Sequence, residues 1–173
     1  GLKLQRGARG VGLRPGESLA KGIALPGNAT ARQSADFTAF LVENESRYAD
    51  EMRECLKKDL KIHANVICSQ LLMFGDVAAL NREQRMDYAD GHSYWQHPSN
   101  SGPGFSIPNT PQIAAIGQAG MGVLGQLAQS RVANKPFSVS EYDHPAPSDY
   151  ACEMMPELST FAALQDWDEI TPF

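Results

Sequence analysis

The residues that could carry chemistry gather in two short stretches, each at the end of a candidate strand. In the first, His92, Tyr94 and Trp95 follow the segment MDYADG, and His97 lies two residues further on. In the second, Glu141 follows the segment PFSVS. Aromatic rings stack on the apolar faces of a sugar, and polar side chains exchange hydrogen bonds with its hydroxyl groups. Both stretches are therefore suited to binding a carbohydrate.

Further polar and aromatic residues extend this set of candidates. Tyr142, Asp143 and His144 continue the second stretch, and we take Tyr142 and His144 as further candidates for substrate contact. His144 lies in a Pro-rich loop, where it could equally cap a helix. Ser69 and Gln70 follow a third β-favouring run, NVIC. We expect all three groups to lie at the ends of strands.

The spacing of apolar residues predicts the elements that must position these groups. Residues 1–33 are rich in Gly, Arg, Pro and Ala and are expected to be a loop-rich lead-in. Apolar residues at helical spacing, with charges between them, predict an amphipathic helix over residues 34–60. The further expected elements are a strand at 61–70, a helix or loop at 75–86, a strand at 86–95, a loop at 96–111, a helix at 111–134, a strand at 136–140, a loop at 141–150, a helix at 151–170 and a strand beginning at 171.

This alternation of helices and strands is typical of βα units around a parallel sheet. We therefore predict an α/β fold in a single domain, residues 1–173. In a barrel of βα units the catalytic residues lie at the carboxyl ends of the strands. The polar and aromatic residues at the predicted strand ends can then converge on one site.

Composition excludes several classes of function. The chain has 173 residues, of which 42% are hydrophobic and 20% charged, as in an ordinary globular protein with one sizeable core. A formal net charge of -5 argues against a nucleic-acid partner, which needs clustered basic residues. No run approaches the ~20 apolar residues of a membrane span. Widely spaced cysteines predict buried free thiols at Cys55, Cys68 and Cys152.

Two segments carry a resemblance to a known family. KPFSVSEYDHPAPSDYACEMMPELSTFAALQDWDEI, residues 135–170, resembles the seventh-strand region of cellulase-like retaining glycosidases, in which a strand ends in a glutamate followed by an aromatic residue. DYADGHSYWQHP, residues 87–98, is similar to their sixth-strand region, where a His and a Tyr line the sugar site. The resemblance covers roughly residues 34–173 and implies a (β/α)8 TIM barrel, present here as a partial barrel.

The resemblance also implies roles for individual residues. Glu141 matches the family's nucleophile, which attacks the anomeric carbon in a reaction that retains configuration. His92 and Tyr94 match positions that orient the nucleophile and the substrate, while Trp95 and His97 would extend the sugar-binding surface. The substrate would be a polysaccharide or oligosaccharide, and no cofactor is implied. The compartment is left open by the sequence, although a secreted or periplasmic location would suit an enzyme of this kind.

One part of the family's site is missing from the sequence. The mechanism needs a second carboxyl group, roughly 5–5.5 Å from the nucleophile, which acts first as acid and then as base. In the family this glutamate follows an Asn at the end of the fourth strand. The dipeptide Asn44-Glu45 lies inside the predicted helix, so we reject it. A complete barrel takes ~250 residues, so we expect the acid/base glutamate in an N-terminal half that precedes this chain.

Other interpretations remain open. A non-catalytic carbohydrate-binding barrel protein would keep the aromatic residues without the acid/base glutamate. A βα hydrolase with a Ser or Cys nucleophile is a weaker alternative, because no GxSxG elbow occurs. A metal site at His92, His97 and His144 fits no compact metal-binding motif, so no metal is predicted. A partial barrel alone would expose two strand edges, and we expect such a chain to be poorly soluble or oligomeric.

Overall fold

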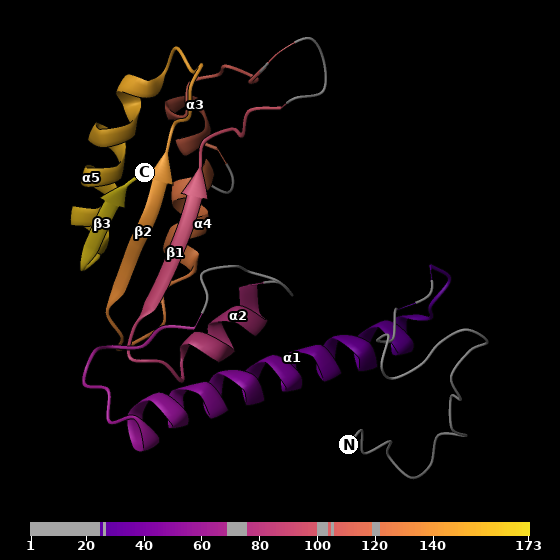
Figure 1. Ribbon diagram of the computed structural model, residues 1–173. Coiled ribbons are helices and arrows are strands. Elements are labelled where there is room, and N and C mark those ends of the chain that lie inside the picture. Colours follow the sequence, from indigo (N-terminus) through magenta and orange to yellow (C-terminus); the bar gives the residue numbers. More distant parts are fainter. Residues whose placement is uncertain (1–24, 26, 69–75, 100–103, 105, 119–121) are drawn as a thin grey trace. The chain divides into compact units, whose positions relative to one another are not determined.

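The computed structural model describes residues 25, 27–68, 76–99, 104, 106–118 and 122–173, which Figure 1 draws as a coloured ribbon. The chain divides into two compact units, residues 1–40 and residues 41–173. All the candidate residues belong to the second unit. Within the described residues, no helix combines the length and the apolar character that a membrane span requires.

A long helix, α1, spans Ala31–Glu54 and continues into a short π-helical turn, η2, at Cys55–Asp59. A capping box fixes its start. Thr30 Oγ1 accepts the backbone N–H of Gln33 at 3.2 Å, and Gln33 Oε1 accepts the backbone N–H of Thr30 at 2.9 Å. The helix predicted over residues 34–60 is confirmed, and its first turn begins three residues earlier than expected.

The second unit contains a parallel sheet of three strands in the order β1-β2-β3. β1 spans Ala89–Tyr94, β2 spans Phe137–Asp143 and β3 spans Glu169–Pro172. Both neighbouring pairs are parallel, so the carboxyl ends of the strands lie at the same edge (Figure 1). The strands predicted at residues 86–95 and at 136–140 are confirmed. The strand predicted from 171 begins two residues earlier, in the last part of the helix predicted over residues 151–170. The fold is mixed α/β with a small parallel sheet, as the sequence predicted.

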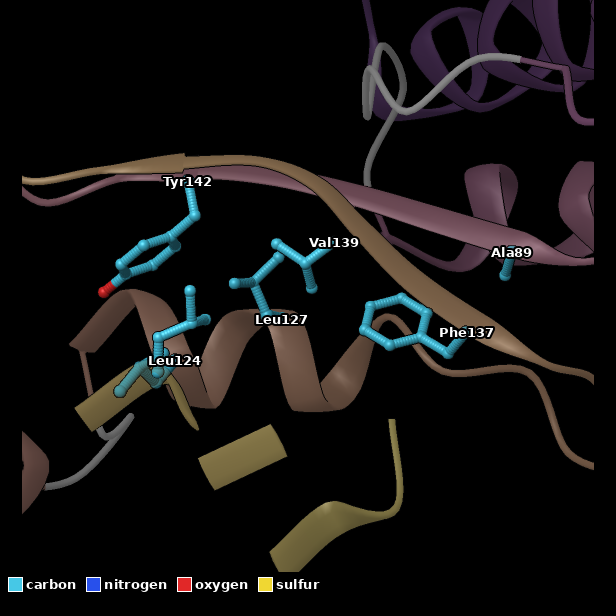
Figure 2. Packing of buried hydrophobic residues seen from close by; sticks show 7 residues of the cluster. Ala89, Leu124, Leu127, Phe137, Val139 and Tyr142 are labelled. Carbon is cyan, nitrogen blue, oxygen red and sulfur yellow. The ribbon is translucent and has the colours of Figure 1, made fainter. Parts of the chain in front are cut away.

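The core lies between one face of this sheet and the helices that connect its strands. α4 (Gly122–Gln129) lies between β1 and β2 in the sequence, and α5 (Met154–Gln165) follows β2 after a short 3-10 turn, η3 (Ala151–Glu153). Full burial of a large apolar side chain stabilises a fold by about 1.5–3 kcal/mol. The core residues, each no more than 3% exposed and most of them labelled in Figure 2, are Ala89, Leu124, Leu127, Phe137, Val139, Tyr142 and Leu158.

The segment before β1 differs from its prediction. Helix α2 (Asp76–Glu83) confirms the helical alternative for residues 75–86. Residues 61–68, predicted to be a strand, form none. Their backbone meets the start of β1 at one place, where Val66 O accepts the N–H of Asp87 at 3.0 Å, and Ile62 is 40% exposed. A segment with a β-favouring sequence forms a strand only where its backbone pairs with a neighbouring strand.

The single helix predicted over residues 111–134 is also wrong. The structure has two helices there, α3 (Ile113–Ile116) and α4. Glycine costs about 1 kcal/mol relative to alanine inside a helix. Gly117 ends α3, and Gly122 begins α4 with φ of +60°, a value that favours glycine. The thiol prediction needs correction too, because Cys152 is exposed and Cys55 and Cys68 are half-buried, although all three are free.

A β-bulge interrupts the pairing of β1 with β2. Gly91 pairs with Val139 and His92 pairs with Glu141, so Ser140 is an extra residue on β2. Side chains of a regular strand alternate between the two faces. Val139 faces the core before the bulge and Tyr142 faces it afterwards (Figure 2). Without the bulge, Glu141 would share the core face of Val139.

Candidate active site

The bulge brings two side chains of β2 against one side chain of β1. His92 Nε2 lies 2.7 Å from Ser140 Oγ, and His92 Nδ1 lies 2.9 Å from Oε2 of Glu141. The side chain of His92 is 20% exposed and that of Glu141 is 25% exposed. Glu141, Tyr142 and Asp143 were expected in a loop over residues 141–150, but they belong to β2. The structure therefore places His92 and Glu141 in contact, near the carboxyl ends of two adjacent strands.

A buried carboxylate, Asp90, completes this cluster. Its side chain is 2% exposed. Oδ2 accepts the hydroxyl hydrogen of Ser140 at 2.6 Å, and Oδ1 accepts the backbone N–H of Ser140 at 3.1 Å and the hydroxyl of Ser138. Oδ2 also lies 3.4 Å from Nε2 of His92. The imidazole ring of His92 thus has one carboxylate beside each of its nitrogens.

Aromatic rings lie at the same edge of the sheet. Tyr94 is two residues beyond His92 and so shares its face of β1. The ring centroids of Tyr94 and His97 are 4.6 Å apart, and those of Tyr94 and Phe173 are 6.1 Å apart with the rings nearly perpendicular. Phe173, directly after β3, is 78% exposed. Tyr94, His97 and Phe173 together form an aromatic surface of the kind that stacks on sugar rings.

Trp95 anchors the long loop over residues 96–111, which contains no helix or named strand in its described part. Its indole N–H donates to the carbonyl oxygen of Thr110 at 2.7 Å. The backbone N–H of Thr110 also donates to Oε1 of Gln96 at 3.2 Å. Further along, Asn109 Nδ2 donates to Asp149 Oδ2 at 2.6 Å. The first two bonds hold the ends of the loop together, and the third fixes the loop to the segment that follows β2. Trp95 is half-buried.

Tyr142 and His144 belong to a different, buried cluster. They are 0% and 2% exposed, so the structure separates them from the cluster around Glu141. The Gln112 amide donates to the Tyr142 hydroxyl at 2.7 Å and to Oε2 of Glu157 at 2.6 Å, and it lies 3.2 Å from Nε2 of His144. Burial raises the pKa of the Tyr142 phenol and that of the Glu157 carboxyl group. In this position Tyr142 and His144 stabilise the fold and present no surface to a sugar.

Sequence reasoning missed three residues of the site. Asp90 could have been found, because it lies two residues before His92 and a strand places such residues on one face. Phe173 lies in the strand predicted from residue 171 and, like Tyr94, is an aromatic residue near the end of a predicted strand. Ser140 could not be grouped with Glu141 by alternation alone, because neighbouring residues of a regular strand face opposite sides and only the bulge puts both on one face.

The contacts of Ser140, His92 and Glu141 resemble those of a hydrolase with a serine nucleophile, in which the histidine accepts the hydroxyl hydrogen. Two observations weigh against that chemistry. The single hydroxyl hydrogen of Ser140 is donated to Asp90, and its backbone N–H is donated to the same carboxylate. The first bond keeps the hydrogen from His92, and the second removes a donor that would stabilise an oxyanion. Glu141 is therefore the better candidate for the reacting group.

Other candidate features lie apart from this cluster. Ser69 and Gln70 fall outside the described residues. Among the residues that the structure describes, no group of three or more metal-ligating side chains could hold an ion. A shallow cavity of about 380 Å³ lies beside residues that precede β1 and β2, including Leu80, Gln84 and Arg131, and so at the opposite ends of the strands.

Comparison with protein-family models, with curated proteins and with solved structures finds no match for this chain.

Proposed function

We propose that this chain forms part of a (β/α)8 barrel and that the barrel is a retaining glycoside hydrolase with Glu141 as its nucleophile. The observation that carries the proposal is the contact of 2.9 Å between His92 Nδ1 and Glu141 Oε2 at the carboxyl ends of adjacent parallel strands. In barrels of βα units, catalytic groups occupy this edge.

The arrangement of the sheet supports the barrel. Its strands follow one another in sequence order, and both connecting helices, α4 and α5, pack on the same face. A doubly wound sheet would carry helices on both faces. The other face of β1 and β2 carries polar groups, namely Asp90, His92 and Glu141. These are the features of one arc of a barrel whose inner face binds substrate.

In the proposed reaction, one oxygen of Glu141 forms a bond to the anomeric carbon while the bond from that carbon to the leaving oxygen breaks. The leaving oxygen takes a proton from the acid/base carboxyl group, which belongs to another strand of the barrel. Water then releases the sugar and returns a proton to that base. Because His92 lies against Oε2, Oε1 of Glu141 is the attacking oxygen. Tyr94, His97 and Phe173 supply the surface against which the sugar ring stacks.

Covalent trapping tests the proposal. The complete enzyme, which contains this chain and the strand that supplies the acid/base carboxyl group, is incubated with 2-deoxy-2-fluoroglycosyl fluorides of several sugars, and the modified peptide is identified by mass spectrometry. We expect an adduct on Glu141. In E141Q we expect no adduct and a fall in kcat/KM on aryl glycosides of more than about a thousandfold, equivalent to about 4 kcal/mol of transition-state stabilisation.

E169Q is the matched control, because Glu169 is an exposed carboxylate on β3. It should label and turn over substrate like the parent protein. Unchanged turnover in E141Q, or an adduct on another residue, would eliminate Glu141 as the nucleophile. Sugar binding with neither adduct nor turnover would favour a non-catalytic carbohydrate-binding protein.

A further inference from the structure

We propose that Asp90 is a positioning residue that acts through Ser140 and His92, holding a doubly protonated His92 ring against Glu141. The functional part of this inference rests on the proposed role of Glu141 as nucleophile. The structural part, which concerns the protons on His92, stands on the contacts of the cluster alone.

The first step concerns the hydroxyl hydrogen of Ser140. A serine hydroxyl has one hydrogen to donate and lone pairs to accept with. Its hydrogen goes to Oδ2 of Asp90, at 2.6 Å, so only a lone pair remains for His92 Nε2 at 2.7 Å. Nε2 must therefore carry a hydrogen and donate it to Ser140.

The second step concerns the other ring nitrogen. Nδ1 of His92 faces Oε2 of Glu141 at 2.9 Å, and an ionised carboxylate offers only acceptors. Nδ1 must then carry a hydrogen as well. The ring is a cation between two carboxylates, with Glu141 beside Nδ1 and Asp90 at 3.4 Å from Nε2. These are the charged groups that β1 and β2 direct at the ring.

The third step concerns why Asp90 can hold this arrangement. Its side chain is 2% exposed and is fixed by the hydroxyls of Ser138 and Ser140 and by the backbone N–H of Ser140. A carboxylate beside the far nitrogen of a histidine fixes the orientation of the ring and stabilises its charged form. Through the ring, Asp90 thereby fixes the position of the Glu141 carboxylate.

Nitrogen NMR of the imidazole rings tests the structural part. The protein has four histidines, so the His92 signals are assigned with H92Q. At neutral pH we expect both ring nitrogens of His92 to show the shifts of a protonated ring in the parent protein. In D90N, where Ser140 can donate its hydroxyl hydrogen to Nε2, we expect a neutral ring. In S140A, where both carboxylates remain but Nε2 loses its acceptor, we expect the Nε2 signal to shift from that of the parent. S140A changes an exposed residue and so tests the contact even where D90N fails to fold.

S159A is the matched control, because Ser159 is an exposed serine of α5 whose hydroxyl donates to Met155 O within that helix. It should leave the ring signals as in the parent. A neutral His92 in the parent protein, with Ser140 donating to Nε2, would overturn the inference and favour a serine nucleophile. Ring signals that are the same in D90N, S140A and the parent would overturn it as well.

Trapping kinetics test the functional part. For D90N and S140A we expect the rate of adduct formation at Glu141 to fall about 10- to 100-fold, the usual effect of a residue that orients a functional group. The fall should appear in kcat with little change in KM, and S159A should stay near the parent rate. If the parent forms no adduct at Glu141, the proposed function fails, while the ring signals still decide whether Asp90 holds His92.

Discussion

Two buried polar side chains organise the polar groups on the two faces of the sheet. Asp90 holds Ser140 on the face that carries Glu141. Gln112, which is 0% exposed, holds Tyr142 and Glu157 on the face that the helices cover. A buried polar group that loses its partner costs about 1–3 kcal/mol. Replacement of one such residue is therefore expected to lower the stability of the fold by more than its small exposed area suggests.

Replacement of Gln112 by leucine tests this at one position. We expect Q112L to lower the free energy of unfolding by about 2–4 kcal/mol, because it leaves both the Tyr142 hydroxyl and the Glu157 carboxylate without the amide that they now share. Urea denaturation followed by circular dichroism measures the change. Q118L is the control, since Gln118 is exposed, and it should stay within about 0.5 kcal/mol of the parent. Equal losses in both variants would contradict the assignment.

At the scale of elements, Asp87 joins the end of the long helix to the start of β1. Its carboxylate lies 2.9 Å from Lys57 Nζ in η2 and 2.6 Å from Arg53 Nη2 in α1, and it accepts the backbone N–H of Val66 at 2.8 Å. Hydrogen bonds from Lys57 and Arg53 hold the pKa of Asp87 well below its ordinary value. Three segments of the second unit are thus tied to one side chain.

This lowered pKa predicts how stability depends on pH. In the unfolded chain the pKa of Asp87 is about 3.9, higher than in the folded protein, so the unfolded chain binds a proton more readily. The contribution of Asp87 to the free energy of unfolding is therefore complete above about pH 4 and is lost as pH falls towards the folded pKa. We expect D87N to be about 2 kcal/mol less stable than the parent at pH 7. Below about pH 4 the difference should shrink. D59N, at an exposed carboxylate of η2, should show no such pattern; the same pH-dependent gap there would argue for a general charge effect.

The elements that the sequence predicts best are those with a long or strongly patterned signal. The helix over residues 34–60 and the strands around His92 and Glu141 were recognised from apolar spacing and from β-favouring runs. The bulge at Ser140 could not be predicted directly, because it depends on the pairing of β2 with β1. A signal does exist in hindsight, since regular alternation after Val139 would bury Glu141. For the same reason, sequence reasoning grouped Tyr142 with the sugar site, whereas the shifted alternation places it in the core.

At the scale of the whole molecule, the three-stranded sheet has two edges, at β1 and β3. An edge strand offers unpaired backbone groups that can pair with another strand. In a closed barrel, neighbouring strands would occupy both edges. The chain studied by itself should therefore associate through them, as the sequence led us to expect of a partial barrel.

A lysine on the edge strand tests this route of association. Thr171 is an exposed residue of β3, and lysine on an edge strand opposes pairing with a second copy. We expect T171K to associate less than the parent in sedimentation velocity over a range of concentrations, with the unfolding free energy changed by less than about 0.5 kcal/mol.

T160K is the control, because it adds the same charge at an exposed position of α5. Because the parent carries a net charge of -5, an added positive charge alone should promote association, not oppose it. Reduced association in T171K but not in T160K would therefore identify the edge as the contact, and equal behaviour of the two variants would contradict it.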